Sequence, residues 1–200
     1  MRYRANAIDK RRGANLPHWT SEGATYSVSF RLADSIPAQA AERLRAELAA
    51  LESNAELDPQ GTHVKDHARI ARLRDESVEA LLNQNYGECL LRNEAAAEIV
   101  KNALKCFEGR RYTLCAWCVM PNHVHVVVRP HDGFNLASIL HSWKSFTAHA
   151  INKLLGRNGG LWQQESYDHL IRDQADLEHH INYVRNNPIK AGLKNWNWVG

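Results

Sequence analysis

Apolar and polar residues alternate along several short stretches of the chain, and this period predicts β-strands at 26–32, 112–120, 123–129 and 167–171. Only Pro121 and Asn122 separate the second and third strands, so we expect a β-hairpin there. Apolar residues at helical spacing and helix-forming residues predict helices at 38–52, 63–84, 94–107, 136–155 and 173–187. Pro188 is expected to end the last helix, because the residue before a proline is pushed out of the α region.

This order of elements, together with the length and composition, favours one α+β domain over residues 1–200. The chain has 200 residues, 44% of them hydrophobic, which is enough to bury a core. Residues 1–18 are expected to form an irregular basic arm, in which Arg11 and Arg12 are candidates for contact with nucleic acid. Residues 53–95 exceed what a minimal core needs and are expected to form a helical insertion after the first helix.

Charge and cysteine content narrow the class of protein only slightly. The formal net charge of +3 is compatible with nucleic-acid binding without requiring it. We expect no membrane span and no secretory signal, because the chain has no long apolar run. Four cysteines are too few for a disulfide scaffold, which favours a reducing cytoplasm.

Two histidines in the 123–129 strand are the sharpest chemical feature. Residues two apart on a strand point to the same face, so His123 and His125 can converge on one cation. Val124, Val126 and Val128 then occupy the other face and are expected to be buried. Spacing alone leaves an ordinary pair of strand histidines equally probable, because His-x-His is a short motif.

A zinc site that combines these histidines with cysteines is the alternative. Cys115 and Cys118 precede the pair, but on a regular strand residues three apart face opposite sides. Only Cys118 is therefore expected on the histidine side, roughly across from His125. Two buried cysteines that act as small hydrophobic residues are the simpler interpretation, and Cys118 as an additional ligand stays open.

The last helix offers a tyrosine and an amide beside each other. Tyr183 and Asn187 are four residues apart and therefore share a helix face, away from the apolar Leu177, Ile181 and Val184. Taken alone, the tyrosine is better explained by packing. Phosphodiester transfer, however, needs an oxygen nucleophile and a cation that takes up phosphoryl charge. Two imidazoles and the Asn187 oxygen would suit Mg²⁺ or Mn²⁺.

Several motifs occur together in one order: Met120-Pro-Asn-His-Val-His125, Trp143-Lys-Ser145, Gly160-Leu-Trp-Gln-Gln-Glu-Ser-Tyr-Asp-His169 and Tyr183-Val-Arg-Asn-Asn-Pro-Ile-Lys-Ala-Gly-Leu193. In these the chain resembles the REP-associated tyrosine transposases, relatives of the single-tyrosine HUH transposases of bacterial insertion sequences. The resemblance implies a ferredoxin-like sandwich with an antiparallel sheet and helices on one face. It also implies cleavage of single-stranded DNA at palindromic hairpins through a 5′-phosphotyrosine, with Tyr183 as nucleophile and His123, His125 and Asn187 as metal ligands.

The resemblance further implies a bacterial, nucleoid-associated protein that is monomeric, with a homodimer as the alternative. Phosphate contacts are expected from basic residues near the motifs, namely Lys144, Arg172, Arg185 and Lys190, although each one is as well explained by a solvated surface. Tyr167 is the rival nucleophile. A hairpin-binding protein without cleavage activity and a zinc-stabilised structural domain are the alternative functions.

Overall fold

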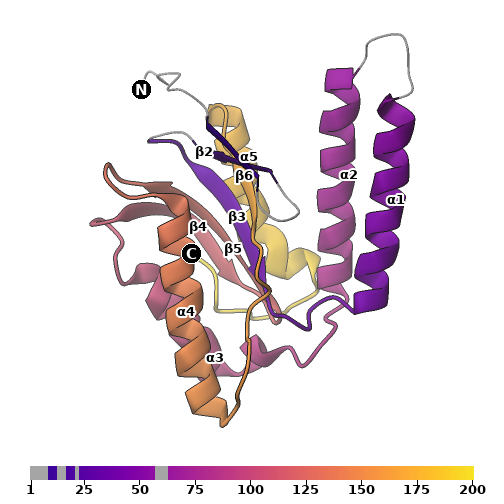
Figure 1. The fold of residues 1–200 in the computed structure, drawn as a ribbon. Helices are drawn as coiled ribbons and strands as arrows, with labels where there is room; N and C mark the ends of the chain where they lie inside the picture. The colour runs from indigo at the N-terminus through magenta and orange to yellow at the C-terminus, as the bar shows by residue number, and fades with distance from the viewer. Residues whose placement is uncertain (1–8, 13–16, 21–22, 57–62) are drawn as a thin grey trace. The chain divides into compact units, whose positions relative to one another are not determined.

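The computed structural model describes residues 9–12, 17–20, 23–56 and 63–200. The chain separates into two compact units, one formed by Met1–Ala33 with Leu90–Gly200 and the other by Asp34–Cys89 (Figure 1). The second unit holds α1 (Ala38–Glu56) and α2 (His63–Asn83). The first unit holds all other elements, which are β1 (Asp9–Arg12), β2 (Pro17–Thr20), β3 (Tyr26–Arg31), the short 3₁₀ helix η1 (Leu90–Arg92), α3 (Glu94–Lys105), β4 (Tyr112–Val119), β5 (His123–Pro130), α4 (Leu136–Leu155), β6 (Tyr167–Leu170) and α5 (Gln174–Lys190).

A four-stranded antiparallel sheet with the order β4-β5-β3-β6 organises the first unit. The predicted α+β fold with an antiparallel sheet is therefore confirmed. On one face, Val124, Val126 and Val128 of β5 are fully buried in the main core, as expected from their alternation. The helices α3 and α4 pack against each other and contribute residues such as Val100 and Trp143 to this core.

The other face of the same sheet is covered by α5, which contacts β4 and β5. Figure 1 shows α4 in front of the sheet and α5 behind it. A second, smaller core joins Val184 of α5 to Val127, Cys118 and Met120. The expectation that helices lie on one face only is thus wrong. Its cause is that β4 and β5 carry apolar residues on both sides, so each side must be covered.

The outer edge of β4 is closed by the C-terminal residues. Trp117 and Gly200 exchange two backbone hydrogen bonds of 2.8 and 3.0 Å, and the Val119 amide donates to the Trp198 carbonyl at 2.9 Å. An uncovered edge strand presents unpaired donors and acceptors to other chains. These three bonds therefore protect β4, which is the first strand of the hairpin that carries His123 and His125.

The second unit is a pair of helices, α1 and α2, that pack on each other. Its ends meet where the Glu88 amide donates to the Asp34 carboxylate at 2.7 Å. Gly87 has φ of +82°, and a Cβ there would lie 2.6 Å from the Asp34 carboxyl carbon, so this turn requires glycine. The insertion predicted at 53–95 therefore has different bounds, and the unit at Asp34–Cys89 also includes the helix expected at 38–52. None of the described side chains of α1 is buried.

The N-terminal arm is more regular than expected. Residues 9–12 and 17–20 form an antiparallel ladder that pairs Asp9 with Thr20 and Arg12 with Pro17. The prediction of an irregular arm over 1–18 is wrong for these residues, because strands of four residues are too short to show a clear alternation. Its other residues, 1–8 and 13–16, lie outside the described part of the chain. No helix in the described ranges combines the length and the apolarity that a membrane span needs.

Candidate active site

The turn between β4 and β5 is held from three sides, and this fixes the strand that carries both histidines. The Met120 amide donates to the His123 carbonyl at 2.8 Å and closes the turn. The amides of Leu32 and Leu91 donate to the carbonyls of Asn122 and Pro121 at 2.8 and 3.1 Å. With its backbone bonded in this way, the turn keeps the first residue of β5 in a defined position.

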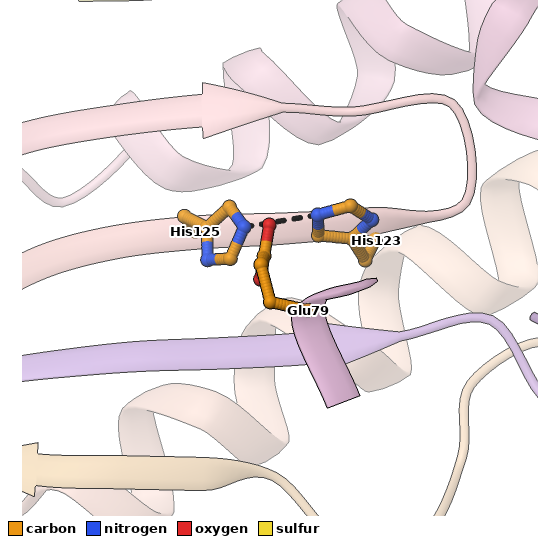
Figure 2. A group of neighbouring side chains, drawn as sticks. All are labelled: Glu79, His123 and His125. Carbon is orange, nitrogen blue, oxygen red and sulfur yellow. Dashed lines mark hydrogen bonds between the residues drawn. The ribbon is translucent and has the colours of Figure 1, made fainter. Parts of the chain in front are cut away.

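The two imidazoles lie on one face of β5, as predicted, and meet at their ring edges (Figure 2). Their Nε2 atoms are 2.9 Å apart, and the ring centroids are 4.6 Å apart at an interplanar angle of 86°. Each Nδ1 atom has a partner of its own, Asn122 Oδ1 at 2.7 Å for His123 and Ser29 Oγ at 2.6 Å for His125. Both side chains are buried. The pair is therefore oriented by hydrogen bonds and packing together.

The donor set fits a divalent cation. An amide oxygen only accepts, so His123 donates its Nδ1 proton to Asn122 and keeps a lone pair on Nε2. When the Ser29 hydroxyl oxygen accepts the Nδ1 proton of His125 in the same way, both Nε2 atoms carry lone pairs that point at one place. A cation shared by the two nitrogens removes the repulsion between these lone pairs. Metal-ligating histidines usually donate the other ring N–H to such a partner. Nitrogens bound at about 2.1 Å and at right angles to one cation lie about 3.0 Å apart, close to the separation observed between these two.

The helix α5 brings the amide and the phenol to the same place. Asn187 is buried, and its Nδ2 lies 3.3 Å from His125 Nε2. The ring of Tyr183 is half-buried and lies edge-on to that of His125, with centroids 5.5 Å apart at 82°. Val184, between the two positions along the chain, packs into the smaller core and fixes the rotation of the helix. Four of the predicted site residues therefore meet at one point of the sheet.

Both ends of α5 bear on this arrangement. Asp173 caps the first turn, with Oδ1 accepting from the Asp176 amide at 2.8 Å. The helix does not stop at Asn187, and the expectation that Pro188 ends it is wrong. A proline inside a helix lacks its own amide donor and crowds the carbonyl four residues earlier, yet here the next turn is still closed by the Ala191 amide, which donates to the Asn187 carbonyl at 2.9 Å. Asn187 thus lies inside the helix, where its backbone is held on both sides.

Cys118 lies directly across from His125 in the β4–β5 register, as the sequence indicated. It is fully buried and packs in the smaller core. Among the described residues, its sulfur does not join the two imidazoles in a group of metal-ligating atoms. The expectation that Cys115 faces the other side is wrong, because a register shift between Leu114 and Ala116 turns Cys115 towards the same core. Burial raises the pKa of the Cys115 thiol, so both cysteines act as small hydrophobic residues.

The rival tyrosine is nearer than its sequence position suggests. Tyr167 of β6 pairs with Ser29 of β3, and Ser29 pairs with His125 of β5. Directly paired residues point to the same face, so Tyr167 projects from the side that carries the imidazoles. It is separated from His125 by two strand spacings, or roughly 10 Å.

The predicted phosphate-contacting residues divide into two groups. Lys190 is exposed, and its ammonium lies 5.1 Å from the centroid of the Tyr183 ring, so it joins the site. Lys144 does not, because α4 lies on the opposite face and its ammonium donates to the carbonyls of Gln163 and Gln164 at 2.7 and 2.8 Å. Burial lowers the pKa of this lysine. The remaining arginines also belong to the first unit. Arg172 is exposed two residues before α5 begins, Arg185 is exposed within α5, and Arg11 and Arg12 lie on β1.

Sequence reasoning missed Ser29 and Asn122 as partners of the imidazoles. A local signal existed for each one. Asn122 directly precedes His123, and Ser29 is a polar residue in a strand whose neighbours Val28 and Phe30 are buried. The signal at Ser29 does not identify its partner, because Ser29 and His125 are 96 residues apart in the chain.

A strand histidine pair beside a helical tyrosine and amide, on an antiparallel α+β sheet, is the arrangement expected of the single-tyrosine HUH class. Residues 78–187, over half of the chain, match the family described as "Transposase IS200 like", and the chain belongs to that family. This match includes His123, His125, Tyr183 and Asn187.

Individual relatives agree with the resemblance seen in the motifs. A REP-associated tyrosine transposase of Escherichia coli K12 is 29% identical over 90 residues, which cover 44% of this chain and 52% of the relative. A provisionally named REP-associated tyrosine transposase of Haemophilus influenzae is 33% identical over 95 residues, which cover 40% of this chain and 54% of the relative. The chain thus spans about half the length of the curated relatives that it matches.

One solved structure supports the fold. It is the structure of a REP-associated tyrosine transposase bound to a REP hairpin, and its TM-score against this chain is 0.50 at 19% sequence identity. The match covers 94% of this chain and 82% of that one. At this identity the likeness shows the shared fold alone.

Proposed function

We propose that this protein is a metal-dependent transposase that cuts and rejoins single-stranded DNA at palindromic, REP-like hairpins. The observation that carries the proposal is the meeting of the His123 and His125 imidazoles with Tyr183 and Asn187 of α5. The names of the relatives, and the hairpin bound by the structural neighbour, support the choice of DNA. All four residues belong to the first unit, so we assign the catalytic domain to it.

Tyr183 is the proposed nucleophile. Its phenolic oxygen forms a bond to the phosphorus, and the bond from phosphorus to the 3′ oxygen breaks. The phenolic proton passes to water, and the leaving 3′ oxygen takes a proton to become a hydroxyl. The DNA is then held as a 5′-phosphotyrosine, whose bond energy allows a 3′-hydroxyl to attack and rejoin a strand without another energy source.

The other residues bind and orient the reacting groups. His123, His125 and Asn187 would hold Mg²⁺ or Mn²⁺, which when bound neutralises charge on the phosphoryl oxygens. Rotation of the Asn187 amide by 180° exchanges its nitrogen near His125 for an oxygen, the ligand that such hard cations prefer. The Lys190 ammonium lies against the Tyr183 ring, and its charge favours the phenolate that forms on attack.

The test uses single-stranded genomic palindromes labelled at either end, incubated with the full chain and Mg²⁺ or Mn²⁺. We expect nicking at the foot of the hairpin and a covalent protein–DNA band on a denaturing gel. Tyr183→Phe should lose both while its dissociation constant for the hairpin changes less than about threefold, since only the phenolic oxygen is removed. Tyr167→Phe is the matched control and should cleave.

Other outcomes reassign the function. Normal cleavage by Tyr183→Phe together with loss in Tyr167→Phe would move the nucleophile to β6. Tight hairpin binding by the unaltered protein without cleavage in either metal would make it a binding module. A sedimenting species with the mass of one chain, 22.7 kDa, would support the monomer that we propose for this bacterial, cytoplasmic protein, and twice that mass would contradict it.

A further inference from the structure

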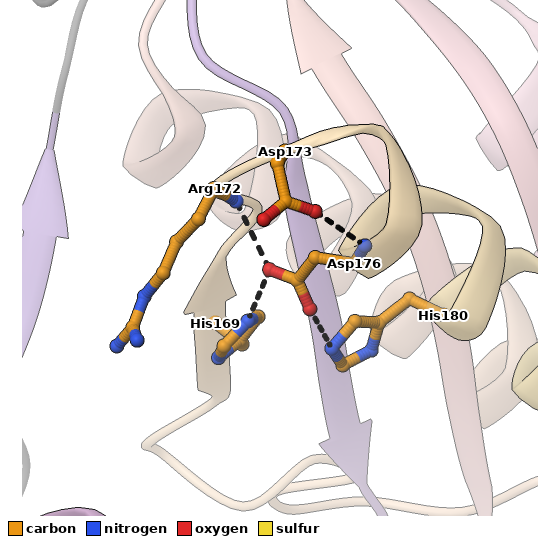
Figure 3. Close-up of polar contacts among 5 residues, drawn as sticks. All are labelled: His169, Arg172, Asp173, Asp176 and His180. Carbon is orange, nitrogen blue, oxygen red and sulfur yellow. Dashed lines mark hydrogen bonds and ion pairs between the residues drawn. The ribbon is translucent and has the colours of Figure 1, made fainter.

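A second group of metal-ligating side chains lies outside the proposed active site. It consists of His169 on β6 with Asp176 and His180, which are four residues apart on α5. His169 Nε2 lies 3.0 Å from Asp176 Oδ2, and His180 Nε2 lies 3.4 Å from Asp176 Oδ1 (Figure 3). The two imidazoles are stacked, with centroids 4.6 Å apart at 27°, so both rings direct Nε2 to the same carboxylate.

The carboxylate at the centre is fixed by the backbone. The Arg172 amide donates to Asp176 Oδ2 at 2.9 Å, and the Asp176 amide is held by the capping carboxylate of Asp173. Figure 3 draws both contacts as dashed lines. Outer hydrogen bonds of this kind orient a ligand before the ion arrives. The three side chains stay 26%, 22% and 20% exposed, which leaves a path for an ion and for water ligands.

The protonation states at neutral pH suit ligation. Burial, together with the charge of His169, lowers the pKa of His180 to about 4 in spite of the nearby Asp176, so this imidazole is neutral. Burial raises the pKa of Asp176, but hydrogen bonds from His169 and the Arg172 amide outweigh it, and the net shift is downward. An ionised carboxylate and a neutral imidazole are the forms that bind a metal, and an imidazole that donates from Nε2 in the metal-free protein shifts this proton to Nδ1 when Nε2 ligates.

We propose that His169, Asp176 and His180 form a second divalent-cation site, which takes a transition-metal ion such as Zn²⁺, Co²⁺, Ni²⁺ or Mn²⁺. Imidazole nitrogens and a carboxylate oxygen are ligands that these ions accept together. An ion at this site would join β6 to the first turns of α5, in which His180 lies three residues before Tyr183. Its ion is therefore a positioning element for the helix that carries the phenol. The rival is a metal-free brace, in which both imidazoles donate to the carboxylate.

The experiment measures how many metal ions bind to each full-length chain, starting from protein from which all metals have been removed. Co²⁺ is titrated and followed by visible absorption and calorimetry, and we expect two equivalents for the unaltered protein. The double substitution His169→Ala with His180→Ala should bind one equivalent. The adjacent, exposed His179 is the matched control, and His179→Ala should keep two.

A second double substitution separates this proposal from the proposed function. His123→Ala with His125→Ala should also leave one equivalent, and that ion should still raise the melting temperature. His180→Gln, which keeps helix propensity and is checked by circular dichroism, should weaken the second equivalent at least tenfold, so failure to fold is not mistaken for loss of the site. The proposal is overturned if the substitutions at 169 and 180 leave the number of bound equivalents the same as in the unaltered protein.

Discussion

The hydroxyl of Ser29 offers a specific test of how the imidazoles are held. Ser29 Oγ lies 2.6 Å from His125 Nδ1 and is its partner away from the proposed ion. Ser29→Ala removes this oxygen and little else, since both side chains are small. The buried His125 Nδ1 then loses its acceptor, which costs about 1–3 kcal/mol for a group that water does not reach.

The loss should appear mainly as weaker metal binding. Removal of the partner of a metal-ligating histidine typically reduces affinity about 10- to 100-fold, which corresponds to about 1.4–2.7 kcal/mol. Ser29 touches the ring nitrogen directly, so we expect a value within this range. The orientation of the ring then depends on packing alone, and cleavage at subsaturating Mn²⁺ should fall in parallel.

Mn²⁺ binding by the metal-free protein, measured by electron paramagnetic resonance of the free ion, gives the affinity. Every protein in this comparison also carries His180→Gln, which weakens ion binding at the site of His169, Asp176 and His180 equally in all of them. Ser27→Ala is the control, because Ser27 lies on the same strand face but pairs with Val127. Equal affinities for the two serine variants would refute the reasoning.

Two further outcomes concern stability. Tyr112→Phe should lower the free energy of unfolding by about 2–3 kcal/mol in urea, because the buried hydroxyl accepts from Trp143 Nε1 at 2.9 Å and donates to the Leu104 carbonyl at 2.8 Å; a loss under about 0.5 kcal/mol would contradict this. In excess chelator, stability should fall as pH drops from about 6.5, where unfolded histidine takes its proton, to about 4, the folded pKa of His180. The loss of stability is at most about 3 kcal/mol. Asp176 adds to this loss only at the acid end, because its folded pKa is lowered. An equal dependence of stability on pH in His180→Gln would show that another group titrates.

Local patterns were enough to predict the ligands within each element. The alternation in β5 put His123 and His125 on one face, and the helical spacing put Tyr183 beside Asn187. Both relations depend only on the geometry of one strand or one helix. The histidine pair and the helical residues meet because α5 packs against β5, which the family resemblance implied and local spacing did not.

Features that depend on strand pairing could not be predicted. Ser29 meets His125 only because β3 lies next to β5, and the cluster of His169 with Asp176 depends on how the chain turns from β6 into α5. The register shift at Leu114 and Ala116 reversed the side expected for Cys115. A single extra residue inverts every later inward and outward position, and no local pattern in β4 marks where it falls.

The central claim, that Tyr183 carries the DNA while His123, His125 and Asn187 hold the cation, is tested most directly by mapping the covalent adduct. Trypsin cuts after Arg157, Arg172 and Arg185, so Tyr167 and Tyr183 fall in different peptides, 158–172 and 173–185. After reaction with a labelled hairpin and nuclease trimming, mass spectrometry should find the phosphonucleotide on the 173–185 peptide, and only when Mg²⁺ or Mn²⁺ was present. An adduct on the 158–172 peptide, or full cleavage with no adduct on either, would contradict the account.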